Sequence, residues 1–419
     1  MNRADALDAV ILGAGAAGMM AAATAGQGGC RVAVLDHAAQ PGRKILISGG
    51  GRCNFTHLDS GPGMFLSANP HFAKSALARY TPADFLELVK RHRIAWHAKT
   101  PGQLFCDRSA SEIVGMLVRE CQQGNVAMHL SNRIIAVRRD ADGIFVVETD
   151  RMVLQARAIV LATGGLSIPK LGATGLSHDV ARRFGLKIVE PAPALVPLTF
   201  GPRDREWMTG LAGVSMEIGA KCHVSQGRRG RDIVFRDGML FTHRGLSGPA
   251  ILQASSYWSP GASLDIDCLP GRDAARCLRE LKKARPRMGG AAMLASLLPQ
   301  RLAHLLAAHH LPDGPVGEMP DSVLDALAGL LSSWRLMPTG SEGYAKAEVT
   351  RGGIDTAGLS SQTMEARDVP GLFAVGEAVD VTGWLGGHNF QWAWSSGHAA
   401  GRALAERALA ERTLAERRD

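Results

Sequence analysis

The sequence predicts an α/β protein that is built on a nucleotide-binding βαβ unit and carries a β-rich insertion and a small helical lobe. Hydrophobic residues 9–12 run directly into the glycine pattern of residues 13–18, and a second hydrophobic run, 31–35, ends in an aspartate. After about residue 195 the chain changes to short alternating segments, and residues 271–333 are rich in alanine, leucine and arginine. The first pattern is typical of a Rossmann-type unit, alternation is typical of strands, and the last composition is typical of helices.

The first glycine pattern, G-x-G-x-x-G, follows a strand and precedes a helix, which is the context that makes it specific for a dinucleotide. Its glycines allow a tight turn and the close approach of a pyrophosphate, and the helix N-terminus offers free N–H groups. Asp36 stands 18 residues after Gly18, where a carboxylate can accept hydrogen bonds from an adenosine ribose. The expected cofactor-binding residues of this unit are Gly13, Gly15, Ala16, Ala17, Gly18 and Asp36.

A second glycine-rich segment occupies residues 42–54 and has the sequence Gly-Arg-Lys-Ile-Leu-Ile-Ser-Gly-Gly-Gly-Arg-Cys-Asn. Because glycine lets the backbone approach a ligand closely, the two segments together predict a phosphate-bearing, flat cofactor and therefore a flavoprotein. Arg52 lies where backbone and ligand are close and is expected either to grip a phosphate or polarise a carbonyl, or only to bind the cofactor pyrophosphate. The expected cofactor-binding residues of this segment are Arg43, Lys44, Ser48, Gly49, Gly50, Arg52, Cys53 and Asn54.

Later segments are expected to return to the cofactor, because ligands of open α/β sheets lie outside the carboxyl ends of the strands. The apolar strand 158–161 leads into two glycines, and the strand 371–376 is followed by carboxylates that can bind a sugar or ribityl hydroxyl. The pair Gly386-Gly387 is either an ordinary helix start or a set of N–H donors that stabilises negative charge on a reduced flavin ring. With the strand 133–138, these segments supply the expected cofactor-binding residues Ile135, Thr163, Gly164, Gly165, Gly376, Glu377, Asp380, Gly386, Gly387, Asn389, Phe390 and Gln391.

Two local signals define elements between these segments. Thr81 is expected to be the N-cap of a helix over 81–90, with Pro82 in the first turn and Asp84 at the electropositive end. The strands 133–138 and 144–148 are joined by a segment that contains Asp-Gly, which is typical of a hairpin turn.

The composition is typical of a soluble enzyme, with 419 residues of which 46% are hydrophobic and 21% charged. The seven cysteines form no C-x-x-C pair, which indicates free thiols and no zinc site. The uncharged stretch 9–26 superficially resembles a signal peptide, but two aspartates precede it and it carries the nucleotide-binding pattern. We therefore expect a cytoplasmic protein with no metal and no membrane association.

Basic residues exceed acidic ones, 47 to 39, which gives a formal net charge of +8. They cluster at residues 90–93, 227–231 and 282–287. Such clusters attract polyanions, but they are also typical of a solvated basic surface, and charge alone does not separate these two interpretations.

Four blocks, at residues 42–56, 241–250, 348–353 and 380–394, resemble the signature blocks of the BaiN/RdsA family of FAD-dependent oxidoreductases. The resemblance extends from about residue 7 to residue 400. Residues 104–110, Leu-Phe-Cys-Asp-Arg-Ser-Ala, resemble the branch of bacterial ribosomal RNA dihydrouridine synthases. The chain departs from the family at His388, where members often have tyrosine.

The resemblance implies a Rossmann-type, glutathione-reductase-like FAD domain with three layers, a β-barrel-like insert and a helical lobe. We place the FAD domain at 1–194 and 346–419, the insert at 195–270 and 334–345, and the lobe at 271–333. The resemblance also implies FAD as cofactor and NADH or NADPH as a transient electron donor. For this branch it implies reduction of the C5–C6 double bond of a uridine in large-subunit ribosomal RNA.

Reduction of uracil requires a hydride at C6 and a proton at C5. Cys53 and Cys106 are candidate acids, because a thiol of ordinary pKa is protonated at neutral pH. His243, beside Arg244, is a candidate for polarising a carbonyl or gripping a phosphate. The structural alternatives are small buried or packing residues for the two cysteines and a satisfied structural pair for His243 and Arg244.

The chain holds one complete G-x-G-x-x-G, so a second nicotinamide-binding domain is not expected, and NAD(P)H is expected to leave before the substrate enters. Two other functions stay open. One is a small-molecule FAD-dependent oxidoreductase or oxidase acting on an amine or an activated alkene. The other is a flavin-carrying redox sensor or RNA-binding module without turnover.

Overall fold

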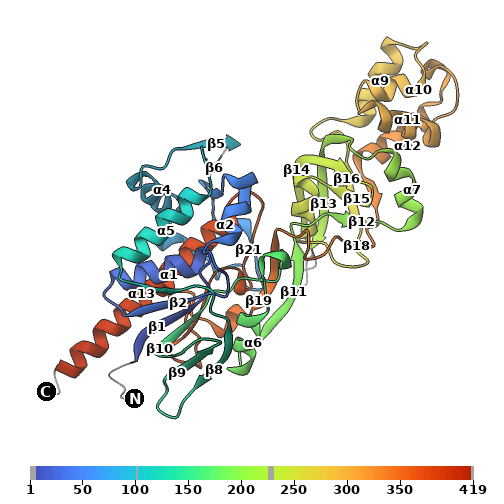
Figure 1. The fold of residues 1–419 in the computed structure, drawn as a ribbon. Helices are drawn as coiled ribbons and strands as arrows, with labels where there is room; N and C mark the ends of the chain where they lie inside the picture. The colour runs from blue at the N-terminus through green and yellow to red at the C-terminus, as the bar shows by residue number, and fades with distance from the viewer. Residues whose placement is uncertain (1–5, 101, 225–230, 417–419) are drawn as a thin grey trace. The chain divides into compact units, whose positions relative to one another are not determined.

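The computed structural model describes residues 6–100, 102–224 and 231–416, so most of the basic cluster at 227–231 lies outside the described residues. The chain divides into two compact units (Figure 1). The first comprises residues 1–192 and 349–419, and the second comprises residues 193–348.

A largely parallel sheet forms the centre of the first unit. Its parallel strands lie in the order β7 (Ala127–His129), β2 (Val32–Leu35), β1 (Leu7–Leu12), β10 (Val153–Leu161) and β20 (Leu372–Ala374). The predicted hairpin, β8 (Ile134–Arg139) and β9 (Phe145–Thr149), pairs antiparallel with the first half of β10. The carboxyl-terminal residues of β1, β2 and β10 are buried, as expected for apolar parallel strands. The predicted α/β fold class is confirmed.

One helix packs on strands β1 and β2 and contacts two further helices. Helix α1 (Ala16–Gln27) contacts α5 (Ser111–Gln123) and α13 (His388–Glu416), as Figure 1 shows. Glycines of α13 make the approach possible, because a Cβ atom at Gly397 would lie 2.4 Å from the Ala17 carbonyl oxygen. A Cβ atom at Gly401 would lie 2.7 Å from the Ala21 carbonyl oxygen. The small residues of α1 and α13 therefore allow the backbones to meet.

The predicted helix start at Thr81 is confirmed. Helix α4 (Pro82–Arg91) follows α3 (Lys74–Arg79) and begins with a capping box. The Asp84 N–H donates to the Thr81 hydroxyl at 3.3 Å, and the Thr81 N–H donates to the Asp84 carboxylate at 2.7 Å. The two residues thereby satisfy backbone donors that the helix itself leaves free.

The first unit also contains several short helices and strands. Helix α2 (Arg43–Ile47) leads into a tight 3₁₀ turn, η1 (Ser48–Gly51), and later comes α6 (Leu176–Arg183). The small antiparallel pairings are β3 (Asn54–His57) with β6 (Gln103–Cys106), β6 with β5 (Trp96–Thr100), and β4 (Phe65–Leu66) with β21 (Thr382–Gly383). A further two-stranded sheet joins β11 (Ile188–Ala194) to β19 (Val349–Ile354).

The second unit is an antiparallel sheet with a helical lobe. The strand order is β17 (Trp334–Leu336), β16 (Leu264–Asp267), β13 (Ser215–Val224), β14 (Arg231–Phe241), β15 (Gly245–Ser247), β12 (Leu198–Thr199) and β18 (Gly340–Ser341). Helix α7 (Pro202–Gly210) follows β12, and α8 (Pro249–Ser255) packs on β13 and β14. The lobe comprises α9 (Ala274–Ala284), α10 (Gly290–Ala295), α11 (Gln300–His310) and α12 (Asp321–Ser332).

No helix in the described part of the chain is both long enough and apolar enough to cross a membrane. All seven cysteines lie within the described residues and are free thiols, as the sequence predicts.

Candidate functional site

The first glycine turn joins β1 to α1 and leaves no room for side chains. Gly13 has φ 112°, and a Cβ atom there would lie 2.5 Å from the Ala162 carbonyl oxygen. A Cβ atom at Gly18 would lie 1.9 Å from the Gly13 carbonyl oxygen. Helix α1 begins at Ala16, and its N-cap residue is Gly15. Because glycine has no side chain, the N-cap residue does not bond the first N–H groups of the helix. This is the arrangement that binds a phosphate at a helix N-terminus.

Asp36 closes this turn from the end of β2. Its carboxylate accepts the Ala14 N–H at 2.7 Å and the Ala38 N–H at 2.8 Å. The oxygen that accepts the Ala14 N–H has room for a second donor, whereas the other also lies 3.4 Å from His37, so the residue can hold the turn and still accept a ribose hydroxyl. Binding of a ribose hydroxyl by Asp36 stays a prediction. The sequence did not predict that this side chain also fixes the turn.

The second glycine segment forms a tight loop between α2 and β3. Gly49, Gly50 and Gly51 have φ values of 56°, 65° and 83°, and Cys53 has a φ of 49°. At Gly50 and Gly51 a Cβ atom would meet no protein atom within 4 Å, so this backbone borders open space. The loop is fixed from behind, because the Ala110 N–H donates to the Gly51 carbonyl at 2.8 Å. The loop therefore presents bare backbone to a ligand.

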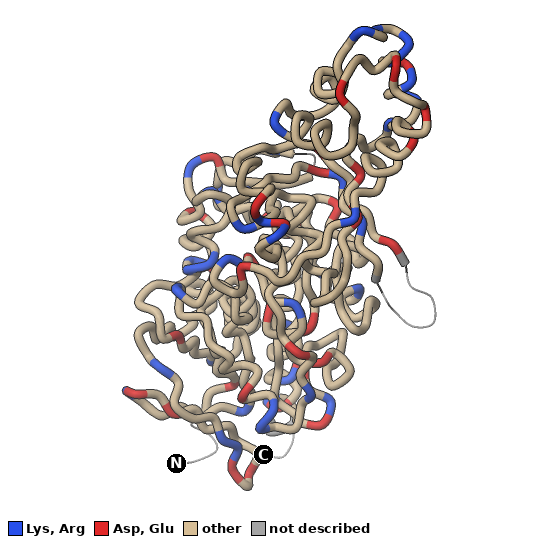
Figure 2. Tube along the Cα trace, turned by 90° about the vertical axis from the view of Figure 1, so that its right-hand side faces the viewer, with Lys and Arg blue, Asp and Glu red and all other residues tan. Residues whose placement is uncertain are grey.

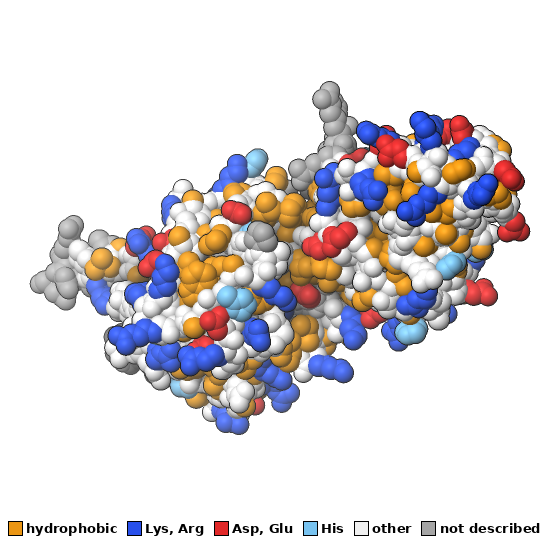
Figure 3. All heavy atoms as spheres, turned by 90° about the horizontal axis from the view of Figure 1, so that it is seen from above, with side chains coloured by type: hydrophobic (Ala, Val, Ile, Leu, Met, Phe, Trp, Pro, Cys, Tyr) orange, Lys and Arg blue, Asp and Glu red, His pale blue; other side chains and the backbone are white. Residues whose placement is uncertain are grey.

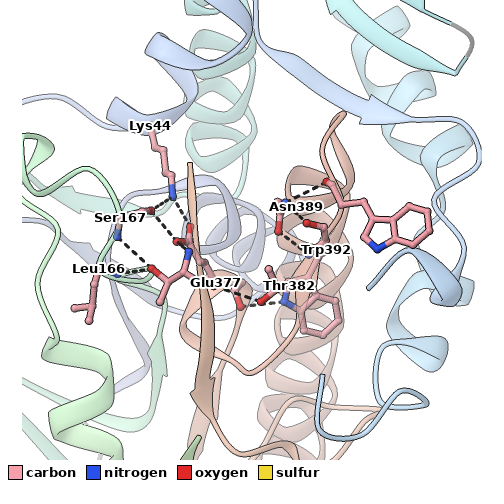
Figure 4. A network of polar contacts seen from close by, with 11 residues as sticks. Lys44, Leu166, Ser167, Glu377, Thr382, Asn389 and Trp392 are labelled. Carbon is pink, nitrogen blue, oxygen red and sulfur yellow. Dashed lines mark hydrogen bonds and ion pairs between the residues drawn. The ribbon is translucent and has the colours of Figure 1, made fainter. Parts of the chain in front are cut away.

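Lys44 and Glu377 meet across the site (Figure 4). The Lys44 ammonium lies 2.5 Å from one carboxylate oxygen of Glu377 and 2.7 Å from the Ser167 hydroxyl. The other carboxylate oxygen accepts the Ser167 hydroxyl at 2.9 Å and the Thr350 N–H at 2.9 Å. Gly165 makes this packing possible, because a Cβ atom there would lie 2.5 Å from the Thr350 hydroxyl oxygen.

Ser167 and Thr350 were not among the expected site residues. The Thr350 hydroxyl accepts the N–H groups of Leu166 and Ser167 at 2.8 and 3.1 Å and so fixes the turn after β10 (Figure 4). A signal for Thr350 existed in the sequence, because it lies in the family block 348–353. Ser167 carries no such signal.

The glycine pair before α13 is closely packed. Gly386 and Gly387 have φ values of 114° and 96°, and a Cβ atom at Gly387 would lie 2.8 Å from the Asn54 amide. Asn389 holds the turn, because its side chain accepts the Gly383 N–H and donates to the Gly383 carbonyl, both at 2.8 Å (Figure 4). The Asn389 side chain is therefore bonded within the turn.

Two expected cofactor-binding side chains point into the protein. Gln391 is fully buried and accepts the Thr56 hydroxyl at 2.6 Å while donating to the Tyr80 carbonyl at 3.0 Å. Asp380 is 4% exposed and accepts the Ala68 N–H at 2.8 Å, and desolvation raises its pKa above the ordinary range. Both side chains therefore offer little surface to a ligand.

The remaining expected cofactor-binding residues have varied environments. Arg43 donates to the Leu171 carbonyl at 3.0 Å, and Thr163 shares a hydrogen bond of 2.7 Å with the Ser177 hydroxyl. Gly164 has φ 76° and open space where a Cβ atom would lie. Gly376, Ser48, Asn54 and Phe390 bond or pack within the protein, and Arg52 and Ile135 are exposed.

Cys53 and Cys106 lie in adjoining segments and have no exposed surface. The Cys106 N–H donates to the Arg52 carbonyl at 2.9 Å, which ties strand β6 to the glycine loop. Burial raises the pKa of Cys53 well above its ordinary range and the pKa of Cys106 to about 12. Both thiols are therefore protonated at neutral pH, but their burial denies them contact with a substrate.

His243 lies in the second unit, in the turn between β14 and β15, and is exposed. The turn is shaped by Thr242, whose hydroxyl accepts the N–H groups of Arg244 and Gly245 at 3.2 and 3.1 Å. The structure thus places this candidate in a different unit from the two cysteines.

A histidine pair lies beside the glycine turn before α13. His388 is 3% exposed, shares a hydrogen bond of 2.6 Å with the Ser60 hydroxyl, and stacks on His57 with ring centroids 4.5 Å apart. Desolvation, with a smaller contribution from His57, lowers the pKa of His388 to about 3. His388 is therefore a neutral packing residue at physiological pH.

His97 was not among the expected site residues. His97 of β5 bonds Asp107 at 2.7 Å and stacks on Phe105, with ring centroids 6.0 Å apart. Phe105 in turn packs against Gly49, where a Cβ atom would lie 3.0 Å from its ring. The two side chains of the His97–Asp107 pair are 38% and 44% exposed. Because the pairing depends on the register of β5 on β6, no local motif reveals it.

The residues of the first unit fit FAD. Gly13 and Gly18 provide a tight turn, α1 begins without a side-chain cap at Gly15, and Gly50 and Gly164 border open space. A dinucleotide needs bare backbone of this kind for its phosphates and close backbone contact for its flat ring.

Similarity to known proteins extends over almost the whole chain. The chain is 50% identical to the ribosomal RNA dihydrouridine synthase of Escherichia coli over 398 residues, which cover 95% of this chain and 98% of that protein. It is 42% identical to the Haemophilus influenzae protein of the same name, with coverage of 94% and 98%. It is 28% identical to the 3-dehydro-bile acid delta(4,6)-reductase of Clostridium scindens, again with coverage of 94% and 98%.

Among solved structures, 3-ketosteroid-delta4-(5alpha)-dehydrogenase from Rhodococcus jostii shares the fold. Its TM-score is 0.51 at 16% identity, and the match covers 96% of this chain and 97% of that chain. Residues 7–403 match the family described as the HI0933-like protein Rossmann domain. The chain belongs to the HI0933-like family, and its relatives place it with the ribosomal RNA dihydrouridine synthases of that family.

Proposed function

We propose that this oxidoreductase uses FAD to reduce a uridine of large-subunit ribosomal RNA to dihydrouridine, with NADH or NADPH as electron donor. The observation that carries the proposal is the 50% identity to a protein named ribosomal RNA dihydrouridine synthase over 95% of this chain and 98% of that protein. The glycine-lined site supports it, because Gly50, Gly51 and Gly164 leave room for a flat cofactor.

The residues that would hold FAD lie on four segments of the first unit. The uncapped start of α1 would bind the pyrophosphate, and Asp36 would accept a ribose hydroxyl. The 49–51 loop would lie along the cofactor with its bare backbone, and Lys44 would lie beside a phosphate or ring oxygen while Glu377 holds it in place.

When bound and reduced by NADH or NADPH, FAD would supply the hydride that is added to C6 of the uracil. A proton is added to C5, so that the C5–C6 double bond becomes a single bond. The protein has to orient the base, provide N–H donors for the carbonyl oxygens and deliver the proton. The N–H groups at the start of α13, after Gly386 and Gly387, are donors of the kind that this reaction needs.

The proton donor has to be reachable by the substrate. Cys53 and Cys106 are protonated but fully buried, so we assign them to packing behind the loop. His97 has what the thiols lack, because its ring is partly exposed and Asp107 fixes its orientation. We therefore place His97 first among candidate proton donors, and the expected role of His243 stays an untested prediction.

Deletion of the gene tests whether ribosomal RNA is the substrate. Nucleosides of large-subunit ribosomal RNA from strains with and without the gene are compared by mass spectrometry, and the wild type is re-expressed. We expect dihydrouridine to disappear on deletion and to return with the wild-type gene. Unchanged dihydrouridine would refute the ribosomal RNA substrate and would favour a small activated alkene, in line with the reductase of bile acids to which the chain is 28% identical.

The electron donor has its own test. Because NAD(P)H is proposed to leave before the RNA enters, initial rates at varied donor and RNA concentrations should give parallel double-reciprocal lines. Intersecting lines would contradict this order.

A further inference from the structure

A group of exposed cations lies at the end of helix α9 in the helical lobe. Lys283, Arg285 and Arg287, here called the basic strip, are all exposed. Lysine and arginine positions lie along the lobe in Figure 2, and their side chains stand on its surface in Figure 3. The strip belongs to the sequence cluster 282–287, which alone did not distinguish polyanion binding from a solvated surface.

The strip differs from the neighbouring cations on α9, which form ion pairs. The neighbouring ion pairs are Arg276 with Glu280 at 2.8 Å, Arg279 with Asp325 at 2.5 Å and Lys282 with Asp321 at 2.7 Å. Among the described residues, no carboxylate forms an ion pair with Lys283, Arg285 or Arg287. The strip therefore carries net positive charge that the fold does not neutralise.

The backbone of the strip is held in place. The Met288 N–H donates to the Arg285 carbonyl at 3.0 Å, and the Gly317 N–H donates to the Pro286 carbonyl at 2.8 Å. Gly317 is needed there, because a Cβ atom would lie 2.8 Å from Pro286. The Val316 N–H bonds the Met288 carbonyl at 2.8 Å. A fixed backbone lowers the ordering cost when the side chains bind a ligand.

The helix dipole accounts for only part of the strip. Cations in the last turn stabilise the carbonyl end of a helix, and Lys283 lies in that turn. Arg285 is the C-cap, and Arg287 lies beyond the helix. A stabilising role in α9 therefore does not explain the two arginines.

The chemistry of the strip favours a phosphate backbone over a lipid surface. Arginine presents a planar set of donors that matches phosphate oxygens. A membrane-binding surface would also expose large apolar side chains. Within the described residues the lobe exposes no large hydrophobic side chain.

We propose that the basic strip of the helical lobe binds the phosphate backbone of the RNA substrate. The inference rests on the proposed function and adds to it a docking surface in the second unit. Each cation that neutralises a phosphate releases counter-ions from the RNA, so binding through the strip has to weaken as salt concentration rises.

The test compares two double variants of equal charge. The strip variant is Arg285→Gln/Arg287→Gln, and the control is Arg276→Gln/Arg279→Gln on the same helix, whose arginines are already ion-paired. The probe is fluorescently labelled, unmodified large-subunit ribosomal RNA made by transcription in vitro. Affinity is measured at several potassium chloride concentrations, and dihydrouridine formation is followed in parallel with the FAD-loaded enzyme.

For the strip variant we expect roughly 10–30-fold weaker binding near 0.1 M salt. The slope of the logarithm of the binding constant against the logarithm of the salt concentration should be smaller in magnitude by about 1.4, as for two lost phosphate contacts. The control should stay within about twofold of the wild type, because its arginines contribute less to phosphate binding when paired. KM for RNA should rise in the strip variant, and kcat should not change.

If the wild type forms dihydrouridine, two results would overturn the proposed role of the basic strip and leave the proposed function standing. One is an unchanged slope in the strip variant, and the other is an equal loss in both variants, which would indicate a general charge effect. The single variant Lys283→Gln gives a further readout if the double variant melts at a lower temperature. A wild-type enzyme that forms no dihydrouridine in this RNA would refute the proposed function and the inference together.

Discussion

The ammonium group of Lys44 lies 2.5 Å from the carboxylate of Glu377, although the two residues are 333 positions apart in the sequence. Lys44 belongs to the helix that leads into the 49–51 loop, and Glu377 follows strand β20. The pair therefore connects the loop to the end of the central sheet, where FAD is proposed to bind.

Replacing Lys44 by methionine should release this connection. We expect Lys44→Met to weaken FAD binding by about tenfold or more, which corresponds to about 1.4 kcal/mol. The dissociation constant is measured by quenching of flavin fluorescence. Lys74→Met is the matched control, because Lys74 is exposed on α3. Equal FAD affinity in the two variants would contradict a cofactor-binding role for the pair.

Gly50 should be required for binding of FAD and not for folding of the protein without FAD. Gly50→Ala places a methyl group in open space at φ 65°, which costs about 1–2 kcal/mol of backbone strain. Gly185→Ala introduces similar strain at φ 83°, also in open space, next to α6. The two variants should lose similar thermal stability without FAD, but Gly50→Ala alone should fail to bind it. Normal FAD content in Gly50→Ala would show that the loop does not line the cofactor.

The two buried cysteines should be dispensable for the chemical step. Cys53→Ala and Cys106→Ala remove small buried side chains and are expected to lower the free energy of unfolding by about 1 kcal/mol. Single-turnover reduction of RNA by the reduced enzyme should stay within about threefold of the wild type. A loss of about 100-fold or more at normal FAD content would identify that cysteine as the proton donor after all.

His388 should make the protein less stable in acid. The pKa of the buried ring is lowered to about 3, whereas the unfolded chain takes up a proton near the ordinary pKa of 6.5. The unfolded state therefore binds more protons between these values, and the stabilising contribution falls as pH drops from about 6.5 towards 3, by up to about 1.4 kcal/mol per pH unit.

The matched variants for this pH dependence are His388→Phe and His71→Phe, the second at an exposed histidine. Urea unfolding between pH 4 and 7 should show a shallower pH dependence for His388→Phe only. The same slope in the wild type and both variants would refute the account of His388 as a neutral packing residue.

Local signals predicted a large part of the fold. The capping box of Thr81 and Asp84 and the turn between β8 and β9 are each encoded within a few residues, and the βαβ unit at the first glycine turn is encoded in the continuous segment 7–35. Such elements follow from capping, turn chemistry and strand periodicity. The α/β fold class could therefore be predicted without the structure.

The candidate site was less predictable because its side chains meet through tertiary packing. Gln391 lies at the helix start of the family block 380–394, yet it turns inward to Thr56 and Tyr80. The His97–Asp107 pair depends on the pairing of β5 with β6. The glycine motifs indicate where the backbone is bare, but they do not determine which neighbouring side chains face the ligand.

The central claim is tested most directly with the purified enzyme. FAD-loaded protein is incubated with NADH or NADPH and with large-subunit ribosomal RNA from the deletion strain, and dihydrouridine is counted by mass spectrometry against nicotinamide oxidised. The account predicts one dihydrouridine at one position for each nicotinamide oxidised, in the absence of oxygen. Nicotinamide oxidation without any dihydrouridine would contradict it.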